Sequence, residues 1–228
     1  MTTDNILNFP DSTLYVKKVP KTAFYKHLEV NAKMKQHFVD DVDSMTWLYK
    51  LAPSTLNVVD GKTVHEIVVF HVLMKDKDCP SDVFTFIDKN MPRHVLFVLQ
   101  LADHYRLLLN YKEWISEKEG NFNIVKSFAT EWMPRQQLGL TIEGQTMDKV
   151  YESFAGFISG FGTKSSEDTK RIVELQEQIE KKTRMAEALQ KKVRAEKQFN
   201  RQIELNSEAK NVKREIAALN NELNKIKK

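Results

Sequence analysis

The chain has 228 residues, of which 41% are hydrophobic and 29% charged, and its formal net charge is +4 at pH 7. This length suits one globular domain with an additional segment, or two small domains. A net charge this small permits a nucleic-acid partner without requiring one. Because the chain has a single cysteine, Cys79, it can form neither an intrachain disulfide nor a cysteine-based metal cluster, which favours a reducing compartment.

The N-terminal residues 1–20 carry no basic segment followed by an apolar segment, the arrangement that marks a secretory signal peptide. No apolar run approaches the ~20 residues that a membrane-spanning helix needs. We therefore expect a cytoplasmic protein that does not associate with a membrane.

The first elements expected along the chain are one helix and a group of strands. Residues 21–42 have an apolar side typical of a helix, and residues 45–52 predict a short strand. Residues 55–75 hold two β-rich runs on either side of Asp60-Gly61. This dipeptide is the preferred type I′ turn pair, so we expect a β-hairpin here.

The stretch HEIVVFHVLMK, residues 65–75, is the most strand-like part of the chain. A short helix capped by Ser81 is expected to follow it, and then a strand over residues 93–101. Strand, helix and strand in this order predict a parallel pair joined by a crossover. A further strand over 104–114 and a helix over 146–160 complete an α+β fold, a mixed β-sheet with flanking helices.

The composition changes abruptly after Gly162. All seven glycines and all six prolines lie at or before this residue, and the remainder is rich in helix-forming residues. From Lys164 onward there are 17 Lys and Arg against 11 Asp and Glu, a net charge of +6, which leaves −2 for the rest. We therefore divide the chain into a globular α/β domain, residues 1–162, and a helical coiled-coil tail, residues 163–228.

The tail carries two apolar seams with the 3-4 spacing of a coiled coil. They consist of Ile172, Leu175, Ile179, Leu189 and Val193, and then of Val212, Ile216, Leu219, Leu223 and Ile226. The seams are out of register, with the slip between about residues 196 and 209.

Since no Gly or Pro marks a turn in the tail, we favour one long continuous helix with a stutter at this slip. The alternative is a helical hairpin bent around Asn206–Ser207. In either case the seam needs a covering surface: another protein, a second copy of the chain, or the other half of the tail.

The predicted order of helix, three strands, helix and strand is similar to the restriction-endonuclease-like core. In that core an Asp on one strand and a Glu-x-Lys on the next bind a metal ion and activate water. Glu66 occupies the position of the glutamate, but Val68 stands where the lysine is needed. Lys75 lies too far along the same strand, so Lys50 on a neighbouring strand is the candidate replacement.

A nuclease of this kind would use Glu66, Asp88 and Lys50 as catalytic residues with Mg²⁺. The simpler interpretation is that Glu66 forms an ion pair or lies at a solvated rim at the start of its strand. The histidines show no metal-ligand spacing, and there is no Gly-x-Ser-x-Gly nucleophile motif. Outside the nuclease alternative we expect neither a metal ion nor a cofactor.

Several phrases, read together, resemble a bacterial family known as domain of unknown function 4391. They are KKVPKTAFY, MTWLYKLAPSTLNV, VHEIVVFHVLMK, IDKNMPRHVLFVL, NYKEW and ATEW, and the tail phrase EKQFNRQIELNSEAKNVKREIAAL. The family is often encoded beside helicases and DNA methyltransferases of restriction or phage-defence loci. The resemblance implies an accessory role and no established activity. Lys21, Lys89 and Lys112 lie within the matching phrases and are candidate binding residues.

Taken together, these observations predict a non-catalytic accessory subunit of a bacterial DNA-targeting complex, which pairs with a helicase or methyltransferase. Two alternatives stay open. One is a divergent metal-dependent nuclease, and the other is a DNA-binding protein that uses the basic tail.

Overall fold

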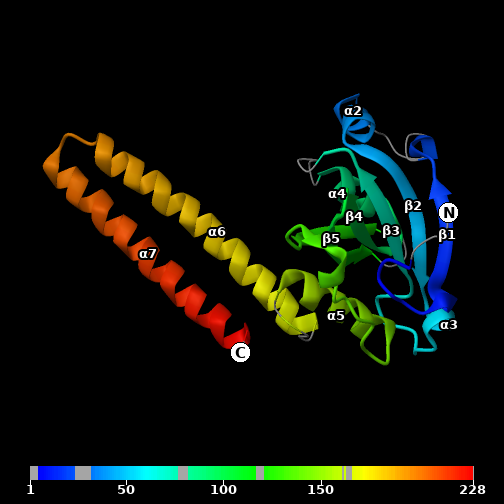
Figure 1. Ribbon diagram of the computed structural model, residues 1–228. Helices are drawn as coiled ribbons and strands as arrows, with labels where there is room; N and C mark the ends of the chain where they lie inside the picture. The colour runs from blue at the N-terminus through cyan, green and yellow to red at the C-terminus, as the bar shows by residue number, and fades with distance from the viewer. Residues whose placement is uncertain are drawn as a thin grey trace. The chain divides into compact units, whose positions relative to one another are not determined.

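A computed structural model describes residues 5–23, 32–76, 82–116, 121–160, 162 and 166–227. It divides into two compact units, Met1–Thr163 and Lys164–Lys228. The first unit is built around a β-sheet, and the second is a pair of helices (Figure 1). This arrangement confirms the predicted α+β fold class.

The sheet has seven strands. Six of them follow one another across it in chain order: β1 (Leu14–Val19), β2 (Val42–Leu51), β3 (Ile67–Met74), β4 (His94–Leu101), β5 (His104–Ser116) and β6 (Asn121–Ala129). The short β7 (Met133–Pro134) pairs with β5. Strands β3 and β4 run parallel, and the other pairs are antiparallel.

Among the described residues, the helices of the first unit are α2 (Ala32–Asp40), α3 (Pro53–Leu56), α4 (Asp82–Lys89) and α5 (Met147–Ser159), with two short 3-10 helices at Asp11–Thr13 and Arg135–Gln137. Thr146 caps α5 through its side chain, and Gly160 ends it in a left-handed conformation. In the described part of the chain, no helix combines the length and the apolar character needed to cross a membrane.

The central strands β3 and β4 are buried on both faces. Alternate side chains of β3, among them Val68, Phe70 and Val72, join a core with Phe38 of α2 and Phe84 of α4. Of the intervening β3 residues, Ile67 and Val69 are buried and His71 and Leu73 are half-buried. They face the opposite side of the sheet because side chains alternate along a strand. Burial on both faces explains why this segment reads as a continuous apolar run.

The predicted crossover from one parallel strand to the next is confirmed, since α4 connects β3 to β4. Ser81, the residue predicted to cap α4, lies outside the described residues, as does the part of the predicted first helix at residues 24–31. In place of the short strand expected at 45–52, β2 extends over Val42–Leu51.

The predicted β-hairpin at Asp60-Gly61 is wrong. Residues Pro53–Leu56 form the helical turn α3 instead of a strand, and β3 pairs with β2 directly. Between α2 and α4 the described residues therefore contain two strands where three were expected. The element order on which the restriction-endonuclease comparison was based is not present.

The tail forms a helical hairpin rather than one continuous helix. Helix α6 (Ser166–Ala195) and helix α7 (Phe199–Lys227) pack against each other side by side (Figure 1). The turn lies at residues 196–198, about ten residues before the Asn206–Ser207 position considered from the sequence. It needs no Gly or Pro because the Glu196 carboxylate accepts hydrogen bonds from the backbone N–H groups of Lys197 and Gln198.

Near the turn, each seam therefore finds its covering surface on the other helix of the same chain. Leu189 and Val193 of α6 pack with Val212 and Ile216 of α7. Of the other predicted seam residues, Ile172, Leu175 and Leu223 are buried, and Ile179, Leu219 and Ile226 are half-buried. The register slip in the sequence marks the place where the chain reverses. Two ion pairs also join the helices, Lys182 to Glu215 at 2.7 Å and Arg171 to Glu222 at 2.6 Å.

Spin labels at positions 182 and 215, introduced as cysteines on a Cys79→Ser background, test this hairpin by pulsed electron paramagnetic resonance. The inter-label distance is expected to be short, below about 20 Å, because packed helix axes lie roughly 8–10 Å apart. One continuous helix would separate the labels by about 50 Å at about 1.5 Å per residue. A single long distance would contradict the hairpin.

Candidate functional site

Glu66 lies immediately before β3 and is held between two cations. Its carboxylate oxygens lie 3.5 Å from the Lys50 ammonium nitrogen and 3.0 Å from Nε of Arg93. Lys50 reaches it from β2, where it is paired with Val68 of β3. Lys50 thus stands beside the position where the nuclease motif requires a lysine. The Glu66 side chain is 12% exposed, whereas Lys50 and Arg93 are 40% and 48% exposed.

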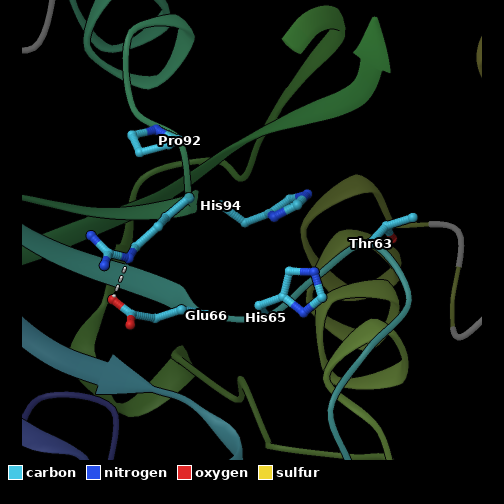
Figure 2. A pocket seen from close by; sticks show the side chains of 6 residues that line it. Thr63, His65, Glu66, Pro92 and His94 are labelled. Carbon is cyan, nitrogen blue, oxygen red and sulfur yellow. Dashed lines mark ion pairs between the residues drawn. The ribbon is translucent and has the colours of Figure 1, made fainter. Parts of the chain in front are cut away.

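A pocket of about 330 Å³ adjoins this cluster, at the amino ends of the parallel strands β3 and β4. Figure 2 shows Glu66 and the rings of His65 and His94 around this pocket, and the dashed line at Glu66 marks its ion pair with Arg93. The pocket is lined by Thr63, His65, Glu66, Pro92, Arg93 and His94.

The loop that leads into β3 is organised by Asp148, in the first turn of α5. The Asp148 carboxylate accepts hydrogen bonds from the backbone N–H groups of Lys62, Thr63 and Val64 and from the Thr63 hydroxyl. Burial alone would raise the pKa of Asp148, but these hydrogen bonds outweigh it and lower the pKa. A Cβ on Gly61 would lie 2.3 Å from the Val64 carbonyl oxygen, so this loop accepts only glycine there.

The two histidines of the pocket have different surroundings. His65 is exposed, and its Nδ1 lies 3.0 Å from the Asp60 carboxylate. His94 is buried, with its ring against Tyr151 and Phe122. Burial and the nearby Lys112 ammonium lower the pKa of His94 to about 3, so this ring is neutral at physiological pH.

Asp88 and Lys112 form a fully buried ion pair, apart from the Glu66 cluster. The Lys112 ammonium lies 2.5 Å from the Asp88 carboxylate, and both side chains have 0% exposure. Asn110 donates to the other carboxylate oxygen at 2.9 Å. Burial raises the pKa of Asp88 to about 6, against the opposing effect of Lys112. Burial also lowers the pKa of Lys112, which the Asp88 charge opposes.

The Lys112 ammonium also forms hydrogen bonds to the backbone at and after the end of α4. It donates to the backbone carbonyl oxygens of Asp88, Met91 and Arg93 at 2.6, 3.1 and 2.8 Å. A cation at this position satisfies carbonyl groups that have no partner within the helix. Lys112 on β5 therefore fixes the connection between α4 and β4, and with it the backbone of Arg93.

The other two candidate lysines, Lys21 and Lys89, have different surroundings. Lys21 donates to the Val42 carbonyl oxygen, and burial and the neighbouring Lys75 lower the pKa of Lys21. It therefore secures the start of β2. Lys89 is exposed at the last residue of α4. Of the residues proposed from the sequence, the structure brings together Lys50 with Glu66 and Asp88 with Lys112.

This geometry limits the chemistry available. A metal-dependent nuclease needs two carboxylates close enough to share one ion. Here Glu66 is paired with Lys50 and Arg93, while the Asp88 oxygens contact Lys112 and Asn110. Among the described residues, no group of three or more His, Cys, Asp or Glu side chains is placed to hold a metal ion.

The sequence did not reveal Arg93, Asn110 or Asp148 as members of these clusters. Arg93 precedes a strand, and its contact with Glu66 depends on the parallel pairing of β3 and β4. Asp148 could have been noticed as an acid in the first turn of a predicted helix, but its partners are about 85 residues away in the chain. Such long-range contacts leave no periodic signal.

These features define a mixed-sheet α+β unit followed by a helical hairpin. The chain belongs to the family described as Domain of unknown function (DUF4391), whose model matches residues 7–216. The match extends from the first unit into the second, as far as Ile216 in α7. No curated protein and no solved structure matches the chain.

Replacing Lys112 by methionine tests the buried pair. We expect the Lys112→Met variant to lose about 3–5 kcal/mol of the free energy of unfolding at pH 7, because an uncompensated carboxylate stays buried. The double variant Asp88→Asn/Lys112→Met should recover part of that loss. Denaturant unfolding of the three proteins measures both effects, and equal losses in the single and the double variant would contradict the pairing.

The same variants have a pH signature. The pKa of Asp88 in the folded chain, about 6, lies above its ordinary value of 3.8. Loss of Lys112 raises it further. A raised acid pKa contributes stability that is fully present below the ordinary value and is lost as the pH rises through the folded value. Because Asp88 of the wild type also keeps its proton up to about pH 6, the deficit of Lys112→Met relative to the wild type should grow as the pH rises above about 6, and this growth should be absent in the double variant.

Proposed function

We propose that this chain is a non-catalytic accessory and assembly subunit of a bacterial DNA-targeting complex. The observation that carries the proposal is that the protein's own cations compensate both candidate catalytic acids. Glu66 lies between Lys50 and Arg93, and Asp88 is paired with Lys112. These ion pairs hold strands and helices in place, which is a structural role and not a catalytic one.

The partner we propose is a helicase or a DNA methyltransferase of a restriction or phage-defence system in the cytoplasm. The resemblance to a family often encoded beside such enzymes supports this choice. The α/β unit is the part that docks on the enzyme. The hairpin covers its own seam, so it does not need a partner to bury that seam.

We place the docking surface of the α/β unit on strand β1, at an edge of the sheet. Two neighbouring apolar side chains, Tyr15 and Val16, are exposed there, with 44% and 42% of their surface accessible. Val16 has a φ of 47° at an irregularity in the pairing with β2, where the Tyr15 ring packs against Trp47 at a tilt of 45°. A β-branched residue at positive φ is strained, and strain of this kind gathers at functional surfaces.

Co-expression with the genomic neighbours tests the role. With a tag on this chain, we expect a neighbour-encoded helicase or methyltransferase to elute with it in a fixed ratio, measured by native mass spectrometry. The Tyr15→Ser/Val16→Ser variant should weaken the complex at least tenfold. The control variant Val39→Ser/Val59→Ser, which changes two other exposed apolar side chains, should retain it. A strictly monomeric chain without any such partner would contradict the proposal.

The nuclease is the second candidate, because Lys50 does lie 3.5 Å from Glu66 as that alternative required. Its catalytic residues would be Glu66 and Lys50, with Arg93 displaced from Glu66 when Mg²⁺ enters. Asp88 would first have to leave Lys112.

Cleavage assays separate the two candidates. With Mg²⁺ or Mn²⁺ and labelled DNA, we expect the wild-type chain, Glu66→Gln and the exposed control Glu143→Gln to show the same background. Divalent-dependent cleavage that falls at least 100-fold in Glu66→Gln and in Lys50→Met, but stays intact in Glu143→Gln, would establish the nuclease instead.

A further inference from the structure

The positive charge of the hairpin is concentrated near its turn. Residues 191–203, called here the hairpin tip, comprise the last turn of α6, the turn itself and the start of α7. The tip contains five Lys or Arg residues and one acid, Glu196. All five cations are exposed, and they are Lys191, Lys192, Arg194, Lys197 and Arg201.

Few of these charges are compensated locally. Arg201 lies 2.6 Å from Glu204. The Glu196 carboxylate is turned toward the backbone N–H groups of Lys197 and Gln198. Across the described chain, the other four cations of the tip have no ion pair within 4.0 Å, whereas further along the hairpin Arg171 and Lys182 are paired with acids of α7. The tip is therefore a compact region of uncompensated positive charge.

An aromatic side chain stands among these charges. Phe199, the first residue of α7, is 72% exposed, and Ile203 one turn later is 53% exposed. The hairpin seam does not use them, since it is formed by Ala186, Leu189, Leu205, Ala209 and Val212. The side chain of Gln202 donates to the Val193 carbonyl oxygen at 3.1 Å and joins the two helices beside the turn. This hydrogen bond anchors the first turn of α7, which carries Phe199, to α6.

We propose that the hairpin tip binds single-stranded nucleic acid without sequence preference, with its cations on the phosphates and Phe199 stacked on an unpaired base. Uncompensated cations around an exposed aromatic ring are the two components of such sites. A membrane surface fits less well, because a helix lying in a membrane needs a continuous apolar face. Here the apolar faces of α6 and α7 are buried against each other. This inference does not rest on the accessory role, since the isolated chain can be tested.

The test is fluorescence anisotropy of the full chain with a fluorescein-labelled oligothymidine of about 20 nucleotides, which exceeds the ~4–16 nucleotides that such sites cover. We expect the triple variant Lys191→Gln/Lys192→Gln/Lys197→Gln to bind at least tenfold more weakly. The matched control Lys210→Gln/Lys213→Gln/Lys225→Gln removes the same charge from exposed positions of α7 outside the tip, and it should change affinity less than threefold. Each lost phosphate contact lowers the salt slope by ~0.7, so the tip variant should lose about 2 from that slope.

Phe199→Ala should weaken binding about tenfold, since stacking on one base contributes ~1–3 kcal/mol. Its salt slope should be unchanged, and Phe199→Tyr should restore binding. Thermal melting followed by circular dichroism confirms that each variant keeps its helices. The proposal is overturned if the wild-type chain does not bind, or if the tip and control variants lose affinity equally. It is also overturned if Phe199→Ala has no effect, or if duplex DNA, polyglutamate or anionic vesicles compete as well as unlabelled oligothymidine.

Discussion

The ammonium group of Lys112 is the constraint around which the α/β unit is arranged. It contacts the Asp88 carboxylate and three backbone carbonyl oxygens, and so it joins the end of α4, the start of β4 and the middle of β5. A buried lysine is tolerated only when its charge and its three N–H groups are satisfied. Because the connection between α4 and β4 is held here, Arg93 is positioned to meet Glu66. The Glu66 cluster therefore depends on the Asp88–Lys112 pair.

In the structure, the two acids that the nuclease alternative requires belong to separate charged clusters. Asp88 and Glu66 are each compensated by their own cation and are used in different places. Lys50 approaches Glu66 from β2, as the sequence predicts with Val68 in the place of the motif lysine. With Arg93 on the same carboxylate, the result is an ion-pair cluster at the amino ends of the parallel strands. Its simplest role is to align β2, β3 and β4.

The local sequence pattern predicted the structural features that depend on burial. It failed for the features that depend on long-range contacts. The order strand, helix and strand predicted the parallel pair of β3 and β4, and the continuous apolar runs of these strands agree with the burial of both strands. Asp60-Gly61 was mistaken for a hairpin turn, since a close approach of Gly61 to Val64 and Asp148 demands the same residue as a type I′ turn. The slip between the tail's two seams predicts a stutter, but the chain reverses near this place, because a turn stabilised by the Glu196 side chain needs neither Gly nor Pro.

The central claim is that Glu66 and Asp88 are structural charges, each compensated by cations of the protein itself. Carboxyl NMR signals of both residues, followed while Mn²⁺ is added, test it most directly. We predict that Asp88 titrates with a pKa of about 6 and that neither signal broadens more than those of exposed carboxylates on the hairpin. Selective, saturable broadening of Glu66 and Asp88 together at low Mn²⁺ would show a shared metal site and contradict this account.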